Sequence, residues 1–139
     1  MRIKTILFAS VMLSLISSGI FIVSCGKKSL EGMIIITQAN SISKSPDYLT
    51  GKSWRYIMES HLYAIDPGNP GKTPESLTEN FFSACSPDIS FDAKCMLFAA
   101  QKNQGDPWQV WEMNLESRKI TQITSGTENS IDPAYLPGE

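Results

Sequence analysis

The sequence contains few of the side chains that catalytic and metal centres use most often. It has one histidine and three cysteines in 139 residues, and no Cys-x-x-Cys pair, so it indicates neither a zinc site nor a dithiol redox centre. Charge is also sparse: 12 basic and 14 acidic side chains leave a net charge of -2, without the basic face that nucleic-acid binding requires. We therefore expect no nucleic-acid partner and no metal site. The 42% of hydrophobic residues argues against a disordered chain, and the length allows one domain.

A long uncharged run stands at the N-terminus. Two basic residues precede an apolar stretch from Ile6 to Val23, which is the arrangement of a secretory signal helix. A membrane anchor that is retained is the alternative, since the run approaches the ~20 residues that span a bilayer. The end of the run favours the first interpretation. Ile22-Val23-Ser24-Cys25 resembles the lipobox of bacterial lipoprotein precursors, which implies cleavage between Ser24 and Cys25 and acylation of Cys25.

This resemblance implies a location and a partner. Residues 1–24 would be the signal peptide, and residues 25–32 a polar tether. Each buried methylene of an acyl chain contributes ~0.8 kcal/mol, so several chains on Cys25 would hold the protein durably on a bilayer. We expect a lipid-anchored protein of the bacterial cell envelope, facing the periplasm or the cell exterior. The lipid bilayer is one expected partner, and an envelope protein is a second.

The rest of the chain contains an internal repeat. Four pairs of segments match in the same order along the chain, the last two at an offset of 46 residues and the second at 48: Met33–Ile36 with Cys95–Phe98, Leu62–Asp66 with Val110–Asn114, Ser76–Thr78 with Gln122–Thr124, and Pro87–Lys94 with Pro133–Glu139. The first pair is further apart than the others, and it fits the same repeat if the first copy has a longer loop within Asn40 to Lys52. A repeat with a period in the forties is typical of stacked β units.

Each copy of the repeat predicts short strands. Met96–Ala100 is a brief apolar run between polar residues, as in a buried strand. Gln109–Leu115 alternates, so that Trp111, Met113 and Leu115 share one face. Ile120–Thr124 is rich in β-branched residues. We expect an all-β fold of antiparallel sheets, with a hairpin turn at Phe91 to Lys94.

Two of these segments resemble a known family. The stretch from Pro87 to Phe98 is similar to the blade-opening motif of TolB-like β-propeller repeats, Pro-x-aromatic-Ser-Pro-Asp-Gly-Lys followed by an apolar strand. More closely, Ser86–Asp92 and Asp132–Pro137 are similar to the propeller domain named after the hydrazine synthase alpha subunit. The resemblance implies an incomplete β-propeller of four-stranded blades: blade one at about 33–80, blade two at about 87–130 and the start of blade three at 131–139. Ala93 stands where the motif has glycine, at a position that often requires φ > 0.

The number of blades raises a question about the chain. Closed propellers have ~4–8 blades, and an incomplete ring leaves strand edges exposed. The chain is therefore either the front end of a longer protein, which we favour, or a short protein that must assemble.

The resemblance to the hydrazine synthase domain does not extend to haem chemistry. A c-type haem would need Cys-x-x-Cys-His, but His61 follows Ser60 and the motif is absent, so no cofactor is expected. A lone histidine such as His61 is more often structural than catalytic. Ser41-Ile42-Ser43-Lys44 fits the Ser-x-x-Lys pattern of penicillin-recognising enzymes, but it has no partner motif and chance explains it better. We expect no catalytic residue and no enzyme within this chain.

The remaining candidates are structural or ligand-binding side chains. Cys85 and Cys95 are ten residues apart, yet a turn at residues 91–94 places Cys95 opposite Ser90, so we expect two separate thiols and no disulfide. Four aspartates near the expected turns could gather a cation, but turn capping is the better interpretation: Asp88, Asp92, Asp106 and Asp132. Among the tryptophans, Trp111 is expected in the core. Trp108 follows Asp106-Pro107 in a loop, so Trp108 and Asp106 are the best candidates for contact with a ligand.

These observations support three functions. The leading expectation is an envelope lipoprotein whose propeller-type module binds a ligand or serves as a scaffold. The second is the N-terminal part of a larger extracytoplasmic enzyme whose catalytic residues lie beyond residue 139. The third is a purely structural component of the envelope.

Overall fold

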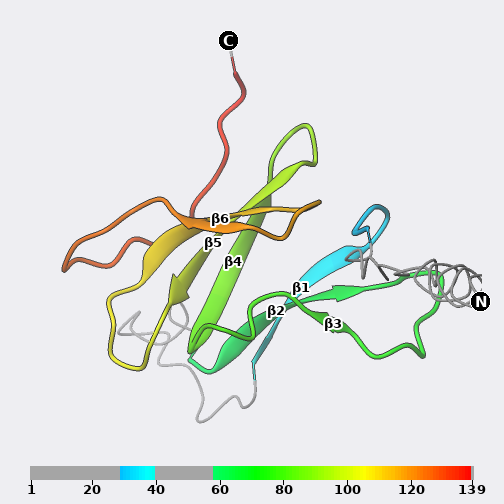
Figure 1. Cartoon of the computed structure of the whole chain (residues 1–139), viewed down its shortest axis with the longest axis horizontal. Coiled ribbons are helices and arrows are strands. Elements are labelled where there is room, and N and C mark those ends of the chain that lie inside the picture. The colour runs from blue at the N-terminus through cyan, green and yellow to red at the C-terminus, as the bar shows by residue number, and fades with distance from the viewer. Residues whose placement is uncertain (1–28, 40–57, 139) are drawn as a thin grey trace, which may run out of the picture.

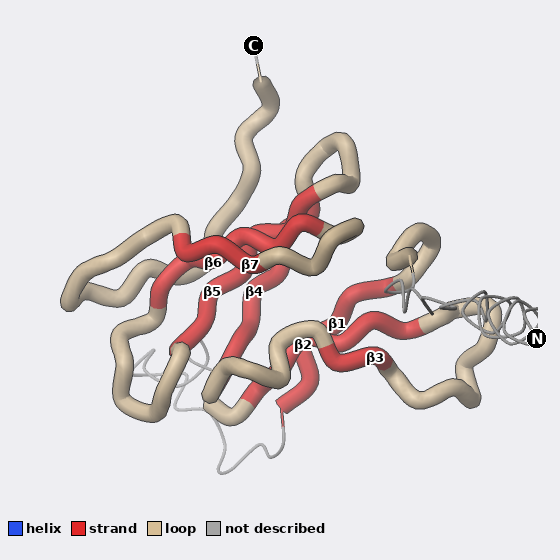
Figure 2. The backbone as a smooth tube through the Cα atoms, viewed as in Figure 1, coloured by secondary structure: helices blue, strands red, loops and turns tan. Residues whose placement is uncertain are grey.

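The chain folds into two antiparallel β-sheets in the computed structural model, which describes residues 29–39 and 58–138. Seven strands and no helix occur in these residues (Figures 1 and 2), so the predicted all-β class is confirmed. The strands are β1 (Ile34–Ala39), β2 (Ser60–Ile65), β3 (Glu75–Ser76), β4 (Ser83–Ile89), β5 (Cys95–Gln101), β6 (Gln109–Asn114) and β7 (Ile120–Gln122). The signal helix, Cys25 and the Ser41–Lys44 motif lie outside the described residues. In the two described ranges, no helix is long and apolar enough to cross a membrane.

The first sheet has the order β1-β2-β3. β1 pairs with β2 from Ile34 opposite Ile65 to Ala39 opposite Ser60. Within β2, burial alternates along the strand, with Ser60, Leu62 and Ala64 buried, because successive side chains of a strand point to opposite faces. The described part of this sheet has three strands, whereas four were predicted.

The second sheet has four strands, in the order β4-β5-β6-β7. Its first strand begins at Ser83, ahead of the Pro87 at which a blade was expected to open. A β-bulge interrupts the pairing of β4 with β5 between Cys85 and Asp88. Pro87 falls in this bulge, where the lack of an N–H donor costs no ladder hydrogen bond. Ser86 before it has a φ of 53°.

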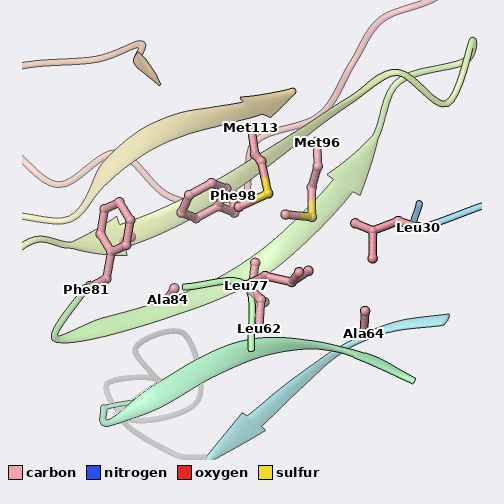
Figure 3. Packing of buried hydrophobic residues seen from close by; sticks show 10 residues of the cluster. Leu30, Leu62, Ala64, Leu77, Phe81, Ala84, Met96, Phe98 and Met113 are labelled. Carbon is pink, nitrogen blue, oxygen red and sulfur yellow. The ribbon is translucent and has the colours of Figure 1, made fainter. Parts of the chain in front are cut away.

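The two sheets stack face to face, and the core lies between them (Figure 3). Leu62, Ala64 and Leu77 come from the first sheet and the residue that follows it, and face a set from the second sheet. The ring of Phe81, in the connection between the sheets, packs edge-on against Phe98 and Trp111 at centroid distances of 5.5 and 4.9 Å, a geometry that aromatic pairs favour. The second-sheet side chains of this core are Ala84, Met96, Phe98, Ala100 and Met113, with Trp111, Leu115 and Ile120 packed against them. The predicted core position of Trp111 is confirmed.

The β4–β5 turn forms where the sequence predicted it. The backbone N–H of Ser90 donates to the carbonyl of Cys95 at 2.9 Å, and the Ser90 hydroxyl and Asp92 carboxylate both accept from the backbone N–H of Lys94. Asp92 therefore caps this turn, as expected. Ala93 has a φ of 55°, which confirms that an alanine stands at a left-handed position that favours glycine.

The internal repeat is visible in the hydrogen bonds. The N–H of Leu62 donates to the hydroxyl of Thr78 at 2.9 Å, and the N–H of Val110 donates to the hydroxyl of Thr124 at 2.9 Å. The next bond along also repeats: Leu77 N–H to Leu62 carbonyl at 2.9 Å, and Ile123 N–H to Val110 carbonyl at 2.8 Å. The offsets are those found in the sequence, 48 residues between the donors and 46 between the threonines.

Strand pairing repeats in the same register. Ile34 lies opposite Ile65 in the first sheet, and Met96 lies opposite Met113 in the second. The strand segments that the sequence aligned, Met33–Ile36 with Cys95–Phe98 and Leu62–Asp66 with Val110–Asn114, therefore occupy equivalent positions. β1-β2-β3 and β5-β6-β7 are two copies of one structural unit.

Candidate functional site

The two predicted ligand contacts line one shallow hollow. Asp106 and Trp108 flank Pro107 in the connection from β5 to β6, at the end of the second sheet. The hollow has a volume of about 450 Å³, and its other lining residues are Met58, Gln101, Gly105, Thr127 and Asn129. The structure thus brings Asp106 and Trp108 together with residues from three other parts of the chain.

Asp106 serves its own loop. Its carboxylate Oδ2 accepts from the backbone N–H and the side-chain amide of Asn103, at 2.9 and 2.8 Å, and its backbone carbonyl accepts from Nε2 of Gln101 at 2.6 Å. Turn capping, the interpretation preferred from the sequence, accounts for these contacts. A ligand at this hollow would meet the Asp106 carboxylate with its Oδ2 already held by Asn103.

Trp108 is not the exposed side chain that its loop position predicted. It is 3% exposed and packs with Cys85 and Ala99, and Ile131 packs against this cluster. Its backbone N–H donates to Oδ1 of Asn129 at 2.9 Å. The expectation of a surface tryptophan was wrong because residues some twenty positions further along the chain fold over it. Ligand contact through Trp108 stays a prediction.

The hollow contains one polar group that the sequence did not single out. Gln101 ends β5 and is 6% exposed. Its Nε2 donates to Asp106, but its Oε1 is buried and accepts no hydrogen bond from any described residue. A buried acceptor of this kind usually has a partner in the form of water or a ligand donor. A polar residue closing an apolar strand was the only sequence signal for it.

A larger groove lies at the other end of the two sheets. It has a volume of about 740 Å³, and the N-terminal segment at Leu30, the β4–β5 turn at Lys94 and the end of the β6 region at Leu115 all border it. The ion pair of Lys94 with Asp92 at 3.2 Å is exposed on both sides, and such pairs contribute little to stability. The groove has a mixed lining with no concentrated charge, so it suggests no ligand class.

The C-terminal segment is bound to the second sheet by polar contacts. Asp132 accepts from the hydroxyl of Ser86 at 3.0 Å, and Asp88 accepts from the backbone N–H of Tyr135 at 2.7 Å. The phenol of Tyr135 donates to Glu112 at 2.7 Å. Burial, and then this bond to the carboxylate, raise the pKa of Tyr135 above its ordinary value. Asp88 and Asp132 therefore link two parts of the chain; they do not cap a local turn.

Other predicted candidates occupy structural positions. Nδ1 of His61 lies 3.1 Å from the carbonyl of Thr78, so the ring donates to the backbone. Cys85 and Cys95 form no disulfide, as expected, and burial raises the pKa of the Cys95 thiol. Over residues 29–39 and 58–138, no three His, Cys, Asp or Glu side chains are grouped so that they could hold a metal ion.

Comparison with known proteins finds a distant and partial similarity. No family model matches the chain. The chain is 28% identical over 111 residues to the hydrazine synthase subunit alpha of Kuenenia stuttgartiensis, a match that covers 78% of this chain and 13% of that protein. A solved structure of Kuenenia stuttgartiensis hydrazine synthase superposes with a TM-score of 0.60 and 26% identity, over 77% of this chain and 14% of the solved one. This chain thus spans about one seventh of the length of the proteins it matches, and resembles one region of them.

Proposed function

We propose that this protein is a lipid-anchored, extracytoplasmic binding or scaffolding module built from propeller-type β units. The observation that supports it most directly is the repeated sheet: two copies of one unit, in equivalent hydrogen-bond register, stacked on a shared core. Rigid strands of this kind hold loops in fixed positions, and loops on a rigid frame are where binding residues concentrate. The hollow lined by Gln101, Asp106 and Trp108 is the place where a ligand could bind, and the buried Oε1 of Gln101 is its candidate acceptor.

The lipid anchor is the part of this proposal that the sequence supports. Cys25 follows an apolar run and an aliphatic-aliphatic-Ser sequence, and acylation there would place the β units at a membrane surface. The module would then face the periplasm or the cell exterior, with the bilayer as one partner and an envelope protein as the second.

A substitution at Cys25 tests the anchor. In the full chain expressed in a bacterial host, Cys25→Ala should abolish labelling by a fatty-acid analogue and leave the precursor uncleaved. Cys95→Ser is the matched control, because Cys95 is a second thiol that lies in a strand. Labelling that persists in Cys25→Ala, or that is lost in Cys95→Ser, would contradict the lipobox assignment.

A second function is supported by the comparison with hydrazine synthase subunit alpha. This chain matches only 13% of that protein, and the alternative proposal is that it is the N-terminal part of a larger extracytoplasmic enzyme whose active site lies beyond residue 139. The intact mass of the native protein from its own membranes separates the two functions. A species of the mature chain plus lipid supports the binding module, and a species several times larger supports the enzyme.

A further inference from the structure

The two sheets contact each other through faces that are not equivalent in the repeat. The first sheet turns Leu62 and Ala64 toward the core, and their equivalents in the second sheet, 48 residues on, are Val110 and Glu112. These two lie on the face of β6 that points away from the core, because Met113 and the packed Trp111 fill the inner face. The contact between the sheets is therefore head to tail.

A head-to-tail contact leaves one face of each sheet outside the interface between the sheets, and the C-terminal segment covers part of that face on the second sheet through Ile131 and Tyr135. The outer face of the first sheet carries Ile34, which is 52% exposed, with Ile36, Tyr63 and Ile65 on the same side. These four residues are the equivalents of Met96, Phe98 and Met113, which are buried, and of Trp111, which is partly buried against the same core. On the outer face of the second sheet, Ile123 is 53% exposed, and it is the equivalent of the buried Leu77. The Ile34 face therefore corresponds to one side of the existing interface between the sheets, and the Ile123 face corresponds to the other side.

The C-terminal segment has the beginnings of a further first strand. Ser60 N–H donates to the hydroxyl of Ser83 at 3.2 Å, and Trp108 N–H donates to Oδ1 of Asn129 at 2.9 Å. Asn129 thus sits on the second sheet as Ser83, the first residue of β4, sits on the first sheet.

Its backbone repeats β4 as well. Asp132 before Pro133 has a φ of 52°, and Ser86 before Pro87 has a φ of 53°. The segment from 129 onward thus has a left-handed residue at the position where β4 has its bulge, but no strand of the described chain pairs with it.

The first sheet has the reciprocal gap. In the second sheet β4 pairs along β5, and β1 is the equivalent of β5. Among the described residues β1 pairs only with β2, so the edge where a β4-like strand would lie has no described partner.

We propose that a second copy of this chain fills both gaps: residues 131–136 of one copy pair antiparallel with the β1 edge of the next. Transferring the β4–β5 register by the repeat offsets places Ile131 opposite Thr37, Ala134 opposite Ile35 and Tyr135 opposite Ile34. The exposed face that carries Ile34 in one copy then packs on the exposed face that carries Ile123 in the other. The contact continues the interface already present between the two sheets of one chain.

The backbone of the segment suits this pairing. In an extended strand, alternate N–H groups point to one edge. Tyr135 N–H is directed back to Asp88, whereas Ala134 and Leu136 donate no backbone hydrogen bond to any residue described. Their N–H groups are the ones that the transferred register directs at β1. Addition of a strand to a sheet edge is a common mode of protein association.

The symmetry of the assembly follows from the contact. A head-to-tail contact closes into a ring or extends into a filament. With two sheets in each copy, rings of ~4–8 sheets correspond to about two to four copies. The proposal depends on the packing of the sheets and is independent of the ligand or the anchor.

Cysteine cross-linking tests the register. Two differently tagged full-length copies, one with Thr37→Cys and one with Ile131→Cys, would be co-expressed and purified in detergent. We expect a disulfide between positions 37 and 131 of different copies, identified by peptide mass spectrometry and lost on reduction. Gln38→Cys paired with Ile131→Cys is the matched control, since residue 38 points to the opposite face, and should cross-link at least ten-fold less.

Light scattering of the unmodified chain in detergent tests the assembly without any substitution. We expect a protein mass that is a whole-number multiple, two or more, of the mass of one processed copy. Ile34→Asp should return it to a single copy. Thr73→Asp, between β2 and β3, should not, since its equivalent in the second sheet, Lys119, is exposed; Ile34 and Thr73 are both exposed in the single chain, so folding is retained. A single-copy mass for the unmodified chain overturns the proposal, and so does an oligomer that forms no 37–131 disulfide.

Discussion

The repeated threonine cap makes a quantitative prediction about stability. Thr78 is 1% exposed, and its hydroxyl accepts from the N–H of Leu62 at 2.9 Å. Thr78→Val keeps the shape of the side chain and removes this acceptor, so the N–H of the fully buried Leu62 is left without a partner. A buried N–H that loses its hydrogen bond costs about 1–3 kcal/mol. We expect the free energy of unfolding to fall by about 2 kcal/mol.

Two matched variants isolate the hydroxyl. Thr78→Ser keeps the oxygen and loses one buried methyl, which costs about 0.8 kcal/mol. Thr124→Val removes the equivalent bond to Val110 in the second sheet and the bond that the Thr124 hydroxyl donates to Oε1 of Gln109 at 2.7 Å. Thr124 is only half-buried, so water can replace part of the lost bonds and the expected cost is about 1 kcal/mol. Urea unfolding, monitored by tryptophan fluorescence, measures all three differences at constant slope.

The order of the three costs decides whether the reasoning holds. If Thr78→Ser destabilises the protein as much as Thr78→Val does, the methyl and not the hydrogen bond is what matters at this position. If Thr124→Val costs more than Thr78→Val, burial does not set the cost of losing these two equivalent hydrogen bonds.

Two further predictions concern single side chains. Ala93→Gly should raise the free energy of unfolding by about 0.5–1 kcal/mol in urea titrations, because a left-handed alanine costs about 1–2 kcal/mol and the entropy cost of glycine offsets part of the gain; an unchanged or lower value would contradict a strained turn. The raised pKa of Tyr135 means that its contribution to stability is present below the ordinary phenol pKa near 10 and is lost as pH rises toward the folded-state value. The difference in stability between the native chain and Tyr135→Phe should therefore shrink in urea titrations above pH 10, and a difference that stays constant up to pH 12 would contradict the burial of Tyr135 together with its bond to Glu112.

Much of the fold was predictable from local pattern. The alternation in Gln109–Leu115 assigned Trp111, Met113 and Leu115 to one face, and all three pack on the core. The β4–β5 turn followed from polar and small residues between two apolar runs. In each case the prediction depends on neighbours within a few positions, where strand geometry and side-chain chemistry act directly.

The sequence by itself determined the all-β class, the positions of β5, β6 and β7, the repeat and the strained alanine, because periodicity and turn chemistry are local properties. Only the tertiary structure decided that Trp108 is buried, that Gln101 holds an acceptor with no described partner, and that Tyr135 reaches Glu112. Each of these depends on which distant segment packs on a sheet face. The repeat pattern indicates that sheets stack, but the face that each sheet turns to the next is set by the packing of whole side-chain surfaces.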